Sequence, residues 1–358
     1  MKGKAILAAL ALAAAAGMNA DAQTLARDGV EVSPEVYSFG EQDALVEMLS
    51  GQFVLRNTGK DELRLEDVVP GCHCTKVEWS REPVAPGDSC VIAFVYHKDM
   101  VTKSFRKDIK VMTNRSDEPL TLKISGVFVE SEESMAQKYP YAHGVLGLES
   151  EVVTLGNVYK GDTTTEIIKV ANRSTEMVRL AVGECSEGVS ANMVKETVLP
   201  LDEGFLRVQV EAGENWGWNE YSVTPTVDGK AVEPIRVRAL TVPDFRDADR
   251  KTKDEGPYPL FQRSTVKLEV ESGKPQGTAW LGLENLGKGT LEVLSAQIPD
   301  GHFKVDCPGR VAANQNTVLK ISLDASGLAP GKYITKMYMV SNSPEAPVSK
   351  VDVVYVVK

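Results

Sequence analysis

The sequence lacks the short motifs that mark most enzyme active sites. It contains no G-x-S-x-G nucleophile elbow, no G-x-x-x-x-G-K-[ST] phosphate loop, no H-E-x-x-H metal motif and no G-x-G-x-x-G dinucleotide loop. Histidine is scarce as well: three of the four, His97, His143 and His302, are scattered, and none has a nucleophile beside it to activate. We therefore expect no enzymatic activity and no cofactor.

Long apolar runs are missing, apart from one near the N-terminus. Two lysines precede an apolar run from Ala5 to Ala16, and the small residues Ala20-Asp21-Ala22 follow it. This order is typical of a secretory signal peptide, so we predict cleavage of residues 1–22 before Gln23. The run is shorter than the about 18 residues that span a bilayer, and the first cysteine, Cys72, stands too far on for a lipoprotein anchor. We expect a periplasmic or secreted protein without a membrane span.

The chain has fewer basic than acidic residues. Without residues 1–22, 38 lysines and arginines stand against 49 aspartates and glutamates, which gives a formal charge of −11. An acidic protein is a poor partner for a polyanion, and no basic stretch with interleaved aromatic residues occurs. We therefore expect no nucleic-acid partner.

The chain does contain a strand-end pattern that occurs three times. An alternating apolar strand ends at Asn57, at Asn172 and at Asn285, and each time a polar turn leads into a second apolar strand. Successive asparagines are 115 and 113 residues apart, which is one domain length and too long for a solenoid repeat. We interpret each asparagine as a turn residue whose side chain bonds to the backbone, not as a ligand-binding amide.

Apolar alternation of period two recurs about every dozen residues along the chain, with turn residues between the segments. About seven such strands fit into each copy, and no useful amphipathic helical window is present. This predicts an all-β protein of three tandem immunoglobulin-like β-sandwich domains after the signal peptide. Stretches rich in charge and proline mark two linkers, so that the predicted order is domain 28–129, linker 130–144, domain 145–243, linker 244–262 and domain 263–358.

The first copy resembles a known family. Four of its segments stand in the order of that family's F-x-F-G, N-T-G, C-G-C-T and P-G elements: Tyr37-Ser38-Phe39-Gly40, Asn57-Thr58-Gly59, Cys72-His73-Cys74-Thr75 and Pro86-Gly87. Residues 34–129 are therefore similar to the bacterial domain of unknown function numbered 1573. The resemblance implies a fold related to the PapD-like and ASH immunoglobulin-type domains, and it implies no activity. The sequence departs from the family at His73, where the family usually has glycine.

The two later copies look like diverged relatives of the first. The second has a single Cys185 where the cysteine pair stood, and the third has no thiol there. Any chemistry of the pair therefore belongs to the first domain. Cys185 and Cys307 each stand alone in a domain, and we interpret them as small core residues.

The cysteines of the first domain favour a structural disulfide. Cys72, Cys74 and Cys90 lie in one predicted domain of an exported chain, and we expect Cys90 to pair with Cys72 or with Cys74. A bond between Cys72 and Cys74 is disfavoured, because residues two apart in an extended strand are about 6.5 to 7 Å apart. The alternative is a metal or redox site, in which Cys72, His73, Cys74 and Cys90, with or without His97, surround copper(I) or zinc.

A second candidate binding site lies in the predicted second domain, where Trp216 and Trp218 share a predicted loop with asparagine and glutamate residues. Indoles at a loop tip can stack on a sugar ring. The structural alternative, which we favour, is that one indole caps the core and the other packs on a neighbouring domain.

The sequence thus predicts a non-catalytic exported protein of the cell envelope, which acts as a binding or scaffold module. Its partner is a protein or an envelope glycan, and addition of a partner's strand to an exposed sheet edge is one expected mode. Two alternatives remain: a carbohydrate-binding protein that uses Trp216 and Trp218, and a periplasmic copper, zinc or thiol-redox protein that uses Cys72, His73 and Cys74.

Overall fold

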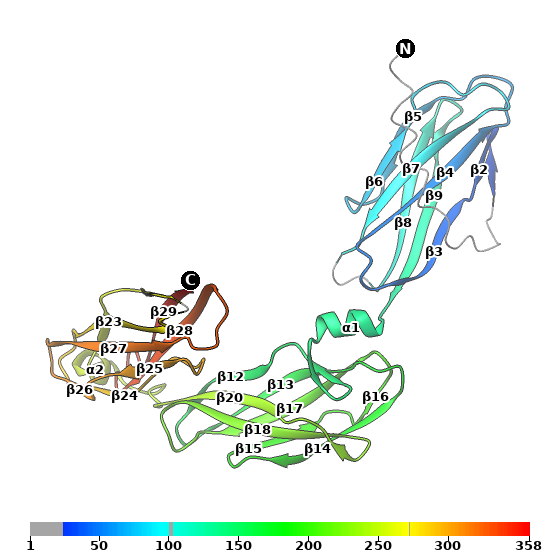
Figure 1. The fold of residues 1–358 in the computed structure, drawn as a ribbon. Helices are drawn as coiled ribbons and strands as arrows, with labels where there is room; N and C mark the ends of the chain where they lie inside the picture. Colours follow the sequence, from blue (N-terminus) through cyan, green and yellow to red (C-terminus); the bar gives the residue numbers. More distant parts are fainter. Residues whose placement is uncertain (1–23, 100–102, 272) are drawn as a thin grey trace. The chain divides into compact units, whose positions relative to one another are not determined.

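The computed structural model describes residues 24–99, 103–271 and 273–358. The predicted signal peptide, residues 1–22, lies outside them. Strands dominate the described residues, which contain two short helices, α1 (Glu132–Lys138) and α2 (Arg250–Glu255) (Figure 1). The predicted all-β, sandwich-type fold is confirmed. The chain divides into two compact units between Gln137 and Lys138.

The first unit holds a β-sandwich. One sheet has the strand order β1-β2-β4-β7-β6, and the other has the order β3-β9-β8-β5. The strands are β1 (Leu25–Arg27), β2 (Val30–Ser33), β3 (Val36–Asp43), β4 (Met48–Asn57), β5 (Leu65–Pro70), β6 (Thr75–Trp79), β7 (Ser89–His97), β8 (Ser104–Thr113) and β9 (Ser116–Val129).

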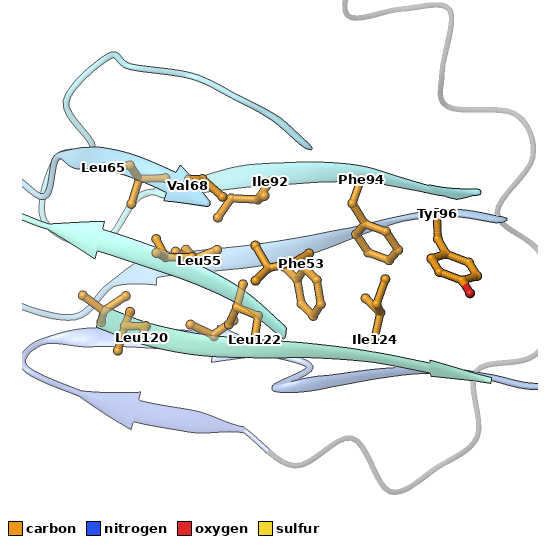
Figure 2. Close-up of a cluster of buried hydrophobic side chains, with 14 of the residues drawn as sticks. Phe53, Leu55, Leu65, Val68, Ile92, Phe94, Tyr96, Leu120, Leu122 and Ile124 are labelled. Carbon is orange, nitrogen blue, oxygen red and sulfur yellow. The ribbon is translucent and has the colours of Figure 1, made fainter. Parts of the chain in front are cut away.

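The core of this sandwich follows from the alternation in the sequence. Successive side chains of a strand point to opposite faces, so every second residue of β4 and β7 enters the space between the sheets. Figure 2 shows Phe53, Leu55, Ile92 and Phe94 turned toward Leu122 and other side chains of the opposite sheet. Phe53, Leu55, Ile92 and Leu122 are fully buried. Removal of this apolar surface from water is the main driving force for the sandwich.

The second unit contains two further pairs of sheets. The first pair has the orders β10-β11-β13-β17-β15 and β12-β20-β18-β14-β16, with β19 on β18. Its strands are β10 (Tyr141–His143), β11 (Leu146–Leu148), β12 (Val152–Tyr159), β13 (Thr163–Asn172), β14 (Val178–Cys185), β15 (Val189–Met193), β16 (Thr197–Val198), β17 (Glu203–Glu211), β18 (Gly217–Val227), β19 (Lys230–Ala231) and β20 (Ile235–Val242).

The second pair of this unit has the orders β21-β23-β27-β25 and β22-β29-β28-β24-β26. Its strands are β21 (Pro259–Phe261), β22 (Thr265–Val270), β23 (Gln276–Asn285), β24 (Leu291–Gln297), β25 (Phe303–Asp306), β26 (Arg310–Val311), β27 (Asn316–Asp324), β28 (Gly331–Ser341) and β29 (Val348–Val357). Each pair of sheets encloses its own hydrophobic cluster. We call the three assemblies the first, second and third sandwich.

The three sandwiches share one topology. In each, an early strand runs parallel to the last strand of the same sandwich: β3 to β9, β12 to β20 and β22 to β29. The other named pairings in the described residues are antiparallel, as expected for immunoglobulin-like sandwiches.

Both segments predicted as linkers contain regular structure. Residues 130–144 include α1 and β10, and β10 pairs with β11. Residues 244–262 include α2 and β21, and β21 pairs with β23. Helix α2 begins after Asp249, whose side chain accepts a hydrogen bond of 2.7 Å from the amide of Thr252, a favourable N-cap. Short elements of this kind carry too little periodicity to be recognised in a sequence, and the domain limits themselves remain a prediction.

The repeated asparagines occupy equivalent, fully buried positions at the end of a strand. The Asn57 amide nitrogen donates to the carbonyl oxygens of Asp61 (2.8 Å) and Val84 (2.9 Å), and its side-chain oxygen accepts from the amide of Gly59 (3.0 Å). One side chain thus serves three backbone groups of two different chain segments. Asn57 has 0% of its surface exposed, so these backbone groups are shielded from water.

Asn172 and Asn285 repeat this arrangement. Asn172 donates to the carbonyl oxygens of Glu176 (2.7 Å) and Leu199 (3.0 Å). Asn285 donates to those of Gly289 (2.8 Å) and Val311 (3.0 Å). The interpretation of the three asparagines as structural turn residues is confirmed.

The structure also shows a second repeated position. The side-chain oxygens of Asn114, Asp228 and Asn342, each 114 residues from the next, accept hydrogen bonds from the amides of Arg64 (2.9 Å), Arg179 (2.9 Å) and Glu292 (2.8 Å). In each sandwich this bond ties a hairpin turn to the neighbouring strand. The sequence signal for it was a polar residue that ends the penultimate long strand of each copy.

The substitution Asn57→Ala is expected to destabilise the first sandwich by roughly 1–3 kcal/mol, because it leaves the Gly59 amide without its partner and removes one of the two donors of the Asp61 and Val84 carbonyls. Hydrogen exchange of peptic fragments, measured on the full chain, would report the loss within that sandwich. Asn114→Ala is the matched control: Asn114 is exposed, so water replaces its bonds and the cost stays below about 1 kcal/mol. Wild-type stability of Asn57→Asp, which would place a carboxylate against two carbonyls, would contradict this account.

Candidate functional site

The cysteine pair lies in the connection between β5 and β6, which passes from one sheet of the first sandwich to the other. The residues from Gly71 to Cys74 form a turn, not an extended strand. Three backbone hydrogen bonds hold it: Gly71 N to Asp108 O (2.8 Å), Thr75 N to Cys72 O (3.3 Å) and His97 N to Cys74 O (2.8 Å).

Cys72 and Cys74 are joined by a disulfide, and their Cα atoms are 5.2 Å apart. The expectation that Cys90 would pair with one of them is therefore wrong. It assumed the residue spacing of an extended strand, whereas the turn brings the two Cα atoms within the ordinary range of a disulfide. Cys90 lies in β7, has a free thiol, and packs against the core of the first sandwich.

This disulfide closes a very small loop. In the chain-entropy model, a loop of three residues contributes about 1.5 kcal/mol of stability, against about 3 kcal/mol for the loop of 17 or 19 residues that the expected pairing would close. The bond therefore contributes little to the stability of the sandwich.

Thr75 is the polar side chain next to the disulfide. Its hydroxyl oxygen lies 3.5 Å from the sulfur of Cys72 and 4.0 Å from that of Cys74, and the residue has only 2% of its surface exposed. Both cysteines are half-buried, and His73 between them is exposed. A disulfide sulfur has no proton, so the hydroxyl is the donor in these contacts.

The structure does not assemble the suggested metal site. Within the described ranges, no group of three or more His, Cys, Asp or Glu side chains is arranged to hold an ion, and this includes Cys72, His73, Cys74, Cys90 and His97. The sulfurs of the pair are bonded to each other and are not thiolate ligands.

The remaining thiols are half-buried. Burial raises the pKa of Cys90 and of Cys185, and it raises the pKa of Cys307 to about 11. Cys185 and Cys307 both pack against the hydrophobic clusters of their sandwiches, as expected for small core residues.

The tryptophan loop of the second sandwich lies against the third. The Trp218 amide donates to the side-chain oxygen of Gln297 at 2.7 Å, and its ring meets that of Tyr338 edge-on with centroids 5.1 Å apart. Trp218 also packs against a buried cluster that joins Leu240 and Val242 to Val340. The geometry gives Trp218 a packing role.

Trp216 lies in the loop just before β18, whereas Trp218 is the second residue of β18, and both are half-buried. The ammonium group of Lys160 is 5.7 Å from the centre of its ring and donates to the carbonyl oxygen of Gly213 at 2.9 Å. The structure thus does not present the two indoles as a matched stacking pair.

A second contact between these sandwiches was not foreseen. The Arg238 guanidinium, paired with Glu220, donates to the carbonyl oxygen of Pro299 at 2.7 Å. Asp300 follows, and burial raises the pKa of its carboxyl group, while the nearby Arg238 and His302 oppose that shift. Its side chain lies 3.5 Å from the hydroxyl of Tyr355, whose pKa burial and this carboxylate raise to about 12. No short sequence pattern signals such a contact.

Comparison with known proteins gives a family match for the first sandwich. Residues 30–128 match the model of the family described as protein of unknown function DUF1573. This confirms the resemblance seen in the sequence, and the matched residues extend from β2 into β9. No curated protein matches the chain.

Solved structures resemble the chain only distantly. A protein of unknown function from Porphyromonas gingivalis W83 has a TM-score of 0.49 and 15% identity, over 60% of this chain and all 100% of that one. The ASH/PapD-like domain 7 of human CEP192 has a TM-score of 0.23 and 13% identity, over 31% of this chain and 92% of that one. The YadV chaperone has a TM-score of 0.22 and 10% identity, over 58% of this chain and 100% of its own. Likeness at this level gives no argument about function.

Alkylation of Cys307 by iodoacetamide is expected to be slow at pH 8 and to accelerate about tenfold for each pH unit up to about 11, because the thiolate is the reacting form. Mass spectrometry of the labelled peptide gives the rate. Denatured protein is the control, since an unfolded thiol titrates near about 8.5. Labelling as fast in the folded protein as in the denatured one at pH 8 would contradict the assigned shift.

Gly217→Ala is expected to disturb the contact between the second and third sandwiches, because a Cβ atom there would overlap Ser295 and Gln297. The expected result is faster hydrogen exchange in β24. Gly229→Ala is the matched control: its φ of 78° is also left-handed, but a Cβ atom there meets nothing within 4 Å. Equal effects of both substitutions would mean that backbone strain, not the contact, was being measured.

Proposed function

We propose that this chain is an exported, non-catalytic binding protein of the cell envelope, and that a protein partner adds a strand to β6 of the first sandwich. The observation that carries the proposal is the unpaired side of β6. Support also comes from the family match of this sandwich, from the predicted signal peptide, and from the finding that neither helix of the described residues is long and apolar enough to cross a membrane.

The free side of β6 follows from its register. β6 is an edge strand whose neighbour in the sheet is β7. His97 N bonds to Cys74 O, so the opposed pair Cys74 and His97 is a hydrogen-bonded pair of the antiparallel ladder. Pairs alternate along such a ladder, and the backbone groups of Val77 and Trp79 therefore point away from β7. Within the described residues, no strand occupies that side.

The side chains of β6 suit an edge that receives a strand. Val77 and Trp79 are half-buried and pack against the core, while Lys76 and Glu78 are exposed with opposite charges. Charged side chains, proline or bulges usually keep an isolated edge strand from pairing. β6 has charged side chains but no proline and no bulge. An incoming strand would gain main-chain bonds from the edge and selectivity from the two charges.

The carbohydrate-binding alternative needs both indoles as a stacking surface for a sugar. Trp218 does not offer one, because it packs on the third sandwich. The metal alternative has no assembled ligand set in the part of the chain described. Strand addition therefore has the better structural support.

The test is a photo-crosslinking residue in place of Lys76, in full-length protein exported by its own cells. We expect a crosslinked adduct with a protein, and we expect Val77→Pro to reduce it by at least about tenfold, because proline removes an amide that the partner needs but that the ladder with β7 does not use.

Ala191→Pro is the matched control. Ala191 lies on β15, the corresponding edge strand of the second sandwich, and its amide also points away from the ladder, since Glu211 N bonds to Gly188 O three pairs away from the Ala191 and Val208 pair. This variant should keep the adduct. An adduct that survives Val77→Pro, or that both variants abolish alike, would overturn strand addition at β6.

A further inference from the structure

We propose that the Cys72–Cys74 disulfide is a thiol–disulfide exchange site whose substrate is a dithiol on an exported protein. The proposal does not depend on strand addition at β6. It rests on the position of the disulfide, on the hydrogen bonds of the turn, and on the hydroxyl of Thr75.

The disulfide lies where another thiol can reach it. It belongs to the turn between β5 and β6, the residues Gly71 and His73 of this turn are exposed, and both cysteines keep part of their surface in water. The other thiol of this sandwich, Cys90, is on β7 and half-buried, and burial raises its pKa, so it is a poor attacking group.

The turn does not need the sulfur–sulfur bond to keep its shape. The backbone bonds from Gly71 to Asp108, from Thr75 to Cys72 and from His97 to Cys74 remain when that bond opens. The two thiols would therefore stay close together in the reduced state. A dithiol held in this way is already arranged to form the disulfide again.

Thr75 supplies the chemical assistance. Its buried hydroxyl has one proton to donate, and it lies within reach of either sulfur, at 3.5 Å from Cys72 and 4.0 Å from Cys74. When the disulfide opens, one sulfur becomes a thiolate, and a hydrogen bond to an ionised acceptor is stronger than one to a neutral acceptor. Thr75 therefore stabilises the leaving sulfur.

The exchange has two steps. A thiolate of the substrate attacks the sulfur of Cys72, which does not pack against the core cluster, whereas Cys74 does. A bond forms between the substrate sulfur and Cys72, the bond to Cys74 breaks, and Cys74 leaves as a thiolate that then takes a proton. The second substrate thiolate attacks the first substrate sulfur and releases Cys72. The substrate dithiol is oxidised to a disulfide, and the cysteine pair gains two electrons and two protons.

The experiment treats the folded full chain with dithiothreitol, quenches it with acid, alkylates the thiols and locates them by mass spectrometry. We expect Cys72 and Cys74 to become labelled together while circular dichroism stays unchanged. Thr75→Val should slow reduction about tenfold, as expected for the loss of a hydrogen bond to a charged sulfur. Thr75→Ser keeps the hydroxyl and should restore the rate, and Thr113→Val, at another buried threonine of this sandwich, should leave it unchanged.

A second variant tests the reactivity of the turn independently, in case Thr75→Val does not fold. Cys74→Ser leaves the Cys72 thiol in the turn, which does not pack against the core cluster, and we expect it to form a mixed disulfide with oxidised glutathione at least about tenfold faster than Cys90 of the same protein, since thiolate fraction and access set such rates. Reduction of the wild type only under denaturing conditions, equal rates for Thr75→Val and Thr75→Ser, or equal reactivity of Cys72 and Cys90 would each overturn the proposal and leave the disulfide as a structural bond.

Discussion

Each sandwich depends on the need to satisfy the buried backbone groups where a strand leaves its sheet. At that point the chain turns and the ladder ends, so the backbone groups of the turn need partners from outside the ladder. A single asparagine in each sandwich supplies two donors and one acceptor, and so ties the turn after its own strand to a segment about 26 residues further on. The asparagine is itself fully buried in each sandwich, so the hydrophobic core can close over it.

The sequence could predict this much because the interactions concerned are local or periodic. Apolar alternation identifies strands one by one, and an asparagine followed by a turn signal identifies its own hydrogen bonds. The second repeat, a strand followed by a polar turn at Asn114, Asp228 and Asn342, was visible in the sequence for the same reason, but the hydrogen bonds of these side chains to another strand were not predicted. The cysteine pairing was predicted wrongly because a two-residue separation has a different length in a turn and in a strand, and neighbouring proline and glycine residues signal the turn only weakly.

Contacts that depend on the relative placement of distant strands could not be predicted from the sequence. The bond from Arg238 to Pro299 joins two sandwiches across 61 positions of sequence, and Trp218 meets Tyr338 across a still longer separation. The connection between the fifth and sixth strands of the first sandwich carries the disulfide. The corresponding connection of the third sandwich, between β24 and β25, holds Pro299 and Asp300 and meets the second sandwich instead. The same connection thus carries a disulfide in the first sandwich and an inter-sandwich contact in the third.

The parallel pairing of an early strand with the last strand of each sandwich affects how the protein bears tension. The chain enters the β3–β9 ladder at one end and leaves it at the other, and the β12–β20 and β22–β29 ladders are arranged alike. A pull on the two ends of a sandwich therefore shears the hydrogen bonds of its ladder together, whereas an antiparallel hairpin pulled from its open end would unzip them one at a time. Each sandwich therefore resists tension applied along the chain through its parallel ladder.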